Sequence, residues 1–115
     1  MTVQELIDSG RFEVVNIGEE TERQIEVPFC CDLLSIAMGR APAGCAWVTV
    51  MGNMNTLAVA TLADAACIIL AEGVLPDEMA LKKAKDQDIT VLKTEDSIFD
   101  AALWIHQQLH GQSYI

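Results

Sequence analysis

Four cysteines and two histidines are the most reactive side chains of this sequence. Cys30 and Cys31 are adjacent, and such a pair could suit a redox sensor or a soft metal ion. Cys45 and Cys67 fall within apolar runs, where a free cysteine packs as a small hydrophobic residue. No Cys-x-x-Cys pair is present, so we expect packing roles for Cys45 and Cys67 and keep Cys30–Cys31 as an open alternative.

The two histidines, His106 and His110, are four residues apart on a predicted helix. That spacing can hold a metal ion only together with a third ligand and supporting partners. Polar and cationic side chains are also favoured in the last turns of a helix, where they complement its dipole. We therefore expect neither a metal nor any other cofactor.

A glycine pair suggests phosphate binding but does not meet its requirements. Gly39 and Gly44 have the spacing of a phosphate-binding loop, yet Cys45 and Ala46 stand where that loop needs lysine and serine or threonine. A predicted helix precedes the glycines and a strand follows them, so no helix N-terminus faces them. The sequence also lacks a nucleophile elbow and any spacing that pairs two carboxylates. We expect no catalysis, including ATPase, kinase, phosphatase and pyrophosphatase activity.

The charge balance argues against polyanionic partners. Seven basic residues face 17 acidic ones, which gives a formal charge of −10. A field of that sign repels nucleic acid and anionic lipid surfaces. The N-terminus has no signal-peptide pattern, and the most apolar stretch, from Leu57 to Ala71, is too short for a membrane span and contains Asp64. We expect a cytoplasmic protein that binds neither nucleic acid nor membranes.

The pattern of apolar residues predicts one α/β domain over residues 1–115. With 51% hydrophobic and 5% aromatic residues, the core must be aliphatic. Expected helices cover Thr2–Gly10, Asp32–Met38, Asn55–Ala63, Pro76–Asp86 and Thr94–His110, and expected strands cover Phe12–Val15, Gln24–Val27, Cys45–Met51, Ala66–Leu70 and Ile89–Leu92. The C-terminal two-thirds reads β-α-β-α-β-α, which favours a mainly parallel sheet flanked by helices.

Three predicted loops follow the buried strands and precede helices. In an open parallel sheet, ligands bind outside the carboxyl ends of the strands, and helix N-termini there can offer N–H groups to an anion. The candidate ligand-binding residues in these loops are Asn53, Asn55, Thr56, Glu72, Gly73, Thr94 and Asp96. The same residue types are also what helix caps and turns require, so both readings remain open.

The last predicted helix carries an apolar stripe through Ile98, Ala102, Ile105 and Leu109 that must face the sheet. Trp104 lies far round from the centre of this stripe, which suggests either an interface or a tryptophan lying flat on its own domain. The predicted helix from Asp32 to Met38 is apolar nearly all round and also needs a cover. The candidate interface residues are Trp104, Leu33, Leu34, Met38 and Tyr114, and we expect a homodimer.

The order of segments resembles the DRTGG domain over nearly the whole chain. The resemblance is carried by Ile25–Val27, Asp32–Ser35, Val48–Val50, Leu57–Ala65, Cys67–Gly73, Ile89–Leu92 and Thr94–Ser97. The family is named for Asp-Arg after one buried strand and Thr-Gly-Gly after the next. Here Asn53-Met54 and Ala71-Glu72-Gly73 occupy those places, so only Gly73 matches, and the arginine that would bind phosphate is missing.

The resemblance implies a non-catalytic regulatory or assembly domain, commonly dimeric. DRTGG domains occur within certain phosphotransacetylases and regulated pyrophosphatases, in some cases beside nucleotide-binding modules, and are similar to the N-terminal domain of HPr kinase/phosphorylase. They also occur as stand-alone proteins encoded beside iron-only hydrogenases, the group that this chain most resembles.

The sequence thus predicts a regulatory or protein-interaction domain that senses a small anionic or adenine-nucleotide ligand at the strand carboxyl ends. The alternative is a small enzyme, or a redox or metal carrier, that uses Cys30–Cys31 or the edge formed by Asn53, Glu72 and Asp96.

Overall fold

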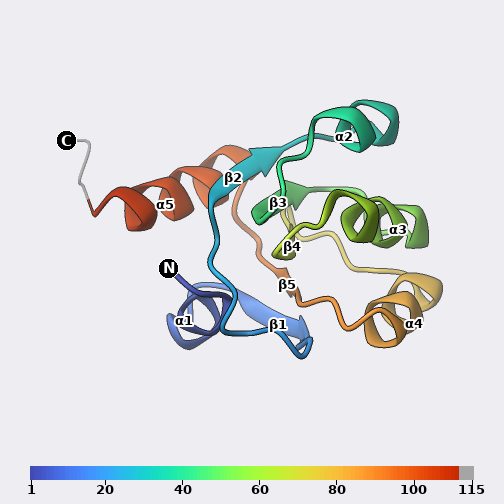
Figure 1. Cartoon of the computed structure of the whole chain (residues 1–115), viewed down its shortest axis with the longest axis horizontal. Helices are drawn as coiled ribbons and strands as arrows, with labels where there is room; N and C mark the ends of the chain where they lie inside the picture. Colours follow the sequence, from blue (N-terminus) through green and yellow to red (C-terminus); the bar gives the residue numbers. More distant parts are fainter. Residues whose placement is uncertain (112–115) are drawn as a thin grey trace.

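A computed structural model describes residues 1–111 of the chain (Figure 1). The helices are α1 (Val3–Asp8), α2 (Leu34–Arg40), α3 (Met54–Ala63), α4 (Glu78–Asp86) and α5 (Ile98–His110). The strands are β1 (Glu13–Asn16), β2 (Val27–Cys30), β3 (Cys45–Thr49), β4 (Cys67–Leu70) and β5 (Val91–Lys93). Tyr114, one of the candidate interface residues, lies outside the described residues.

The strands form one five-stranded sheet with the order β1-β5-β4-β3-β2. From β2 to β5 the strands are parallel, and β1 is added antiparallel to β5. The predicted fold class, one α/β domain with a mainly parallel sheet, is confirmed. Because β2, β3, β4 and β5 are parallel to one another, all their carboxyl ends meet at the same edge of the sheet.

Helices cover both faces of the sheet (Figure 1). The connections between parallel strands place α2, α3 and α4 together on one face, as expected when successive crossovers share one hand. Trp47 of β3 is buried on that face, within a cluster that includes Ile68 and Leu70. On the opposite face, α1 and α5 cover a second cluster that includes Val48, Ile69 and Leu92. All residues of β3 and β4 are buried, which explains their continuous apolar sequence.

Some predicted boundaries are wrong. The second strand was predicted over Gln24–Val27 with Pro28 closing it, but β2 begins at Val27 and contains Pro28. A proline is tolerated there because β2 is an edge strand with a single neighbour, β3. The first helix was placed correctly, since Thr2 and Glu5 form the expected capping box.

Three of the expected helices do not begin with the caps that their sequences suggest, which are Asp32, Asn55 or Thr56, and Thr94 or Asp96. Asp32 does not cap α2; its Oδ1 accepts hydrogen bonds from Thr49 Oγ1 at 2.7 Å and from the Val50 N–H at 2.9 Å, so it joins the β2–α2 loop to the end of β3. The cap of α3 is Asn53 rather than Asn55 or Thr56, and the cap of α5 is Ser97 rather than Thr94 or Asp96. In α3 and α5 a neighbouring polar side chain accepts from the free N–H groups instead, whereas α2 begins after Leu33 without a side-chain cap.

Trp104 packs on its own domain. Its ring meets Phe12 edge to face, with 5.7 Å between ring centroids, and the Arg11 guanidinium lies 5.6 Å from its centre. The side chain is half-buried against the α1/α5 face of the core. Of the two alternatives, the structure shows the tryptophan lying on its own domain, because the segment before β1 brings Phe12 to a position that the helix periodicity alone could not reveal.

Candidate functional site

The carboxyl ends of β4 and β5 are joined by their loops. The Glu72 N–H donates to the Asp96 carbonyl at 2.8 Å, and the Gly73 N–H donates to the Thr94 carbonyl at 3.0 Å. Glu72 has a φ of 59° and Gly73 a φ of 74°, both in the left-handed region. The positive φ favours glycine at this position, whereas the 2.5 Å contact that a Cβ on Gly73 would make with Glu95 Oε2 can be relieved by movement of that exposed side chain.

The backbone donors that the sequence offered to an anion are already occupied by the protein. Glu72 Oε2 accepts a hydrogen bond from the Ile98 N–H at 3.2 Å, so a carboxylate of the chain itself lies at the N-terminus of α5. Asn53 Oδ1 accepts from the N–H groups of Asn55 and Thr56, at 3.0 and 3.2 Å. An external anion at this edge must therefore be held mainly by side chains.

Two cationic side chains border a hollow of about 420 Å³ at this edge, which we call the Lys93 hollow. It is lined by Gly10, Arg11, Phe12, Glu13, Gly73, Leu75, Lys93, Thr94 and Glu95. Since the sequence holds only seven basic residues, the approach of Arg11 and Lys93 to one hollow brings two of the few cations together at this edge, beside the carboxylates of Glu13 and Glu95.

Both cations are paired with carboxylates. Arg11 Nη2 lies 2.7 Å from Asp96 Oδ2, which links the segment before β1 to the loop before α5. Lys93 Nζ lies 3.0 Å from Glu13 Oε2, a cross-strand pair set by the register that places Glu13 opposite Lys93. These four side chains remain 29 to 71% exposed, so each pair adds little to stability and can be rearranged by a ligand.

The structure divides the predicted ligand-binding residues into two groups. Gly73 and Thr94 line the Lys93 hollow, and Asp96 joins it through Arg11. The Glu72 N–H donates to the Asp96 carbonyl and so joins the loop after β4 to the loop after β5. Asn53, Asn55 and Thr56 begin α3 and do not line the hollow.

Thr56 points into the core rather than toward the edge. Its side chain is fully buried, and its Oγ1 has no hydrogen-bond partner within residues 1–111. It borders an apolar space of about 10 Å³ between α3 and α4, next to Leu57 and Ala80. A space of that size and lining has no room for a ligand.

Arg11, Glu13 and Lys93 were not among the predicted site residues. Arg11 and Glu13 precede or begin a short strand whose neighbour the sequence did not specify. The only signal was that both flank Phe12, the start of that predicted strand. The antiparallel addition of β1 to β5 brings them to the carboxyl end of β5, and this pairing depends on tertiary contacts rather than on local sequence.

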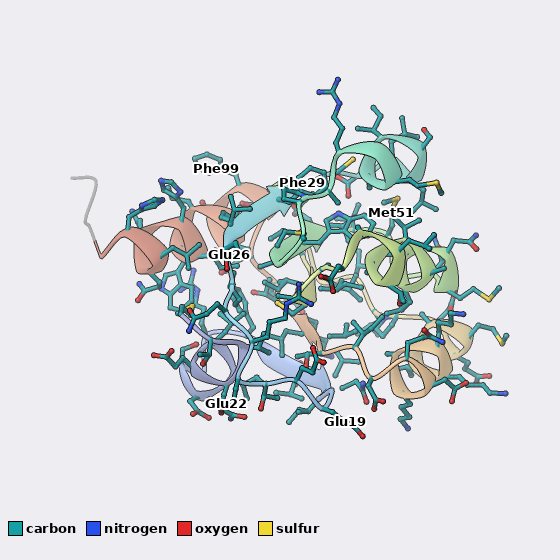
Figure 2. The ribbon with its side chains drawn as sticks, viewed as in Figure 1. Glu19, Glu22, Glu26, Phe29, Met51 and Phe99 are labelled. Atoms are coloured by element: carbon teal, nitrogen blue, oxygen red, sulfur yellow. The ribbon has the colours of Figure 1, made fainter. Side chains whose placement is uncertain are left out.

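A second hollow, of about 300 Å³, lies at the amino ends of β4 and β5 and has the opposite character. It is bordered by Glu19, Glu20, Asp64 and Asp88 with a single cation, Arg23. Arg23 donates three hydrogen bonds to Asp64, two to the carboxylate and one to the main-chain carbonyl, at 2.7 to 2.9 Å. These hydrogen bonds lower the pKa of Asp64. Glu19 and Glu22 project outward from the link between β1 and β2 (Figure 2). This end of the molecule repels anions.

The cysteines differ sharply in their surroundings. Cys45 and Cys67 are fully buried, and burial raises their pKa values to about 11 and about 12. Cys30 is exposed at the surface, but partial burial of its thiol and the nearby Asp32 carboxylate raise the pKa of that thiol as well. The Cys31 thiol donates to the Leu33 carbonyl at 3.3 Å. Within residues 1–111, no group of three potential metal ligands is brought together.

The comparisons with known proteins found a similarity in fold. No family model matches the chain, and no curated protein matches it either. The chain is similar in structure to the CBS and DRTGG domains of the regulatory region of Clostridium perfringens pyrophosphatase, which was solved in complex with its activator, diadenosine tetraphosphate. The TM-score is 0.74 at 19% sequence identity, over 92% of this chain and 46% of that chain. No helix between residues 1 and 111 combines the length and apolar character that a membrane crossing needs.

The burial of the thiols leads to a prediction about their reactivity. With a maleimide at pH 8 under native conditions, at most Cys30 and Cys31 should react, and Cys30 should react more slowly than a free cysteine because its thiolate is disfavoured. Cys45 and Cys67 should react only after unfolding. Mass spectrometry of timed samples measures this. Rapid labelling of Cys30, faster than that of a cysteine peptide, would favour the redox alternative.

Proposed function

We propose that this chain is a non-catalytic regulatory or interaction domain of the DRTGG type that binds a small anionic ligand, such as an adenine nucleotide, at the Lys93 hollow. The observation that carries the proposal is the meeting of Arg11 and Lys93 with Gly73 and Thr94 at the carboxyl ends of β4 and β5. This is the edge at which open parallel sheets bind their ligands.

The physical setting supports sensing rather than catalysis. A formal charge of −10 weakens the binding of any anion, so the ligand should bind reversibly and with modest affinity. Two of the carboxylates around the hollow, Glu13 and Asp96, are paired with its cations, and no nucleophile stands beside a base there. The similar pyrophosphatase region is a regulatory region bound to a dinucleotide. Its likeness in fold, together with the segment order of the DRTGG domain, supports a regulatory role.

The same reasoning supports a role beside a partner protein. The stand-alone DRTGG proteins that this chain resembles are encoded near iron-only hydrogenases, so we propose a hydrogenase-associated process as the first to examine. Binding of the ligand would loosen or exchange the Arg11–Asp96 pair, and Arg11 also contacts Trp104 of α5. Through these contacts, ligand binding would change the surface that a partner protein contacts.

The proposed site predicts a specific loss of affinity. Arg11→Gln and Lys93→Gln should each weaken binding of adenosine monophosphate about ten-fold or more, because a hydrogen bond to a charged group contributes roughly 1.5 to 3 kcal/mol. Arg40→Gln, which removes a cation at the end of α2 outside the hollow, is the matched control and should leave affinity unchanged. Isothermal titration of the three variants measures this. Equal losses in all three, or no binding at millimolar nucleotide, would contradict the proposed site.

The proposed homodimer now rests on α2 rather than on Trp104. Leu33, Ile36 and Met38 at or within α2 are 55, 48 and 59% exposed, and Leu34 is half-buried. Phe99 of α5 is 70% exposed and projects beside β2 (Figure 2). An apolar surface of this kind at the free edge of the sheet is typical of an interface.

The dimer is tested by substitutions on this surface. Leu33→Ser and Met38→Ser should each raise the dimer dissociation constant about ten-fold, since truncating an interface side chain costs more than about 1 kcal/mol. Leu62→Ser on α3, which is 75% exposed, is the matched control. Sedimentation velocity over a concentration series measures the constants. A monomeric wild type at tens of micromolar would contradict the dimer, and a dimer insensitive to both substitutions would exclude α2 as its interface.

A further inference from the structure

A second space adjoins the Lys93 hollow, and most of the side chains that line it are apolar. Glu13, Leu75 and Lys93 line both, so the two spaces share a border. The second space, which we call the Leu81 groove, has a volume of about 320 Å³. It is lined by Glu13, Val14, Val15, Leu75, Pro76, Leu81 and Lys93. The Glu13–Lys93 ion pair therefore stands at the junction between a charged compartment and an apolar one.

The Leu81 groove offers an apolar surface that the fold leaves uncovered. Leu75 lies in the loop before α4 and is 65% exposed, an unusual position for a leucine beside charged residues. Val15 of β1 and Leu81 of α4 form the floor and are half-buried. A flat apolar group of a ligand held at Lys93 would cover these side chains and remove their surface from water.

The charges of the Lys93 hollow limit how much negative charge a ligand can carry. Arg11 and Lys93 face three carboxylates, Glu13, Glu95 and Asp96, which leaves a local formal charge of −1. Lys93 has three N–H donors and Arg11 has five, and each ion pair is a single N···O contact that uses one of these donors. The remaining donors suffice for one phosphate. Each further phosphate would add negative charge to a compartment and a protein that are already negative.

We propose, on the premise of the function proposed above, that the ligand carries a single phosphate linked through a sugar to a flat aromatic ring system, as in a nucleoside monophosphate. The phosphate binds at Lys93 and Arg11, and the ring lies in the Leu81 groove against Leu75. The chain then selects against polyphosphates by charge and against inorganic phosphate by the missing ring. Selectivity comes from having both compartments side by side.

The experiment compares four probes by titration into the wild-type protein, with amide shifts as the readout: adenosine monophosphate, ATP, adenosine and inorganic phosphate. Adenosine monophosphate should bind at least ten-fold more tightly than adenosine or inorganic phosphate, and more tightly than ATP. Amides of Val15 and Leu81 should shift with adenosine monophosphate but not with inorganic phosphate.

One substitution separates the two compartments. Leu75→Ser should weaken adenosine monophosphate about five-fold or more and leave inorganic phosphate unchanged, because it removes apolar contact but no charge. Leu62→Ser, on an equally exposed leucine outside both spaces, should change neither. Since Leu75 is largely exposed, its substitution does not threaten folding.

The outcomes distinguish this inference from the function on which it rests. If Leu75→Ser binds adenosine monophosphate like the wild type, or if ATP binds more tightly than adenosine monophosphate, the single-phosphate inference is overturned. Binding of inorganic phosphate that is lost in Lys93→Gln would then still support an anion site at the hollow. If none of the four probes produces shifts at millimolar concentration, both the inference and the proposed ligand site are wrong.

Discussion

The burial of β3 and β4 on both faces is the constraint on which the rest of the structure depends. Every residue of these two strands is buried, so helices must cover both sides of the sheet and each connection must cross over with a helix. Parallel crossovers then bring the ends of β3, β4 and β5 to one edge. The geometry of the site is in this sense a consequence of two short apolar segments, Cys45–Thr49 and Cys67–Leu70.

At that edge, the free N–H groups and the two cations are already paired with polar or acidic side chains of the protein itself. The Glu72 carboxylate lies at the N-terminus of α5, the Asn53 side chain caps α3, and Asp96 and Glu13 pair with the two available cations. These side chains of the protein occupy the places that an external anion would take. The ion pairs hold Arg11 and Lys93 in position at the proposed anion site, while the carboxylates keep the edge from attracting polyanions. The cost is affinity, since a ligand must share these cations with carboxylates.

The sequence predicted the elements well and their contacts poorly. Continuous apolar runs identified β3 and β4, and Pro76-Asp77-Glu78 indicated the start of α4, which begins at Glu78 after an Asp77 cap. Local patterns could not indicate that Asp32 bonds Thr49 Oγ1 instead of capping α2, or that Phe12 covers Trp104. Gly73 and Thr94 were predicted because strand ends are local features. Arg11 and Lys93 were missed because their meeting depends on the register of an antiparallel pair 80 residues apart in sequence (Glu13 opposite Lys93).

The central claim is that side-chain cations at the end of β5, and not the backbone at the helix N-termini, hold the anion. It is tested most directly by following the side-chain nitrogen resonances of Lys93 and Arg11 by NMR while inorganic phosphate is added. The account predicts that both resonances shift along one binding isotherm, while the amides of Asn55 and Thr56 stay in place. Phosphate-dependent shifts at Asn55 and Thr56 with unmoved Lys93 and Arg11 side chains would contradict it.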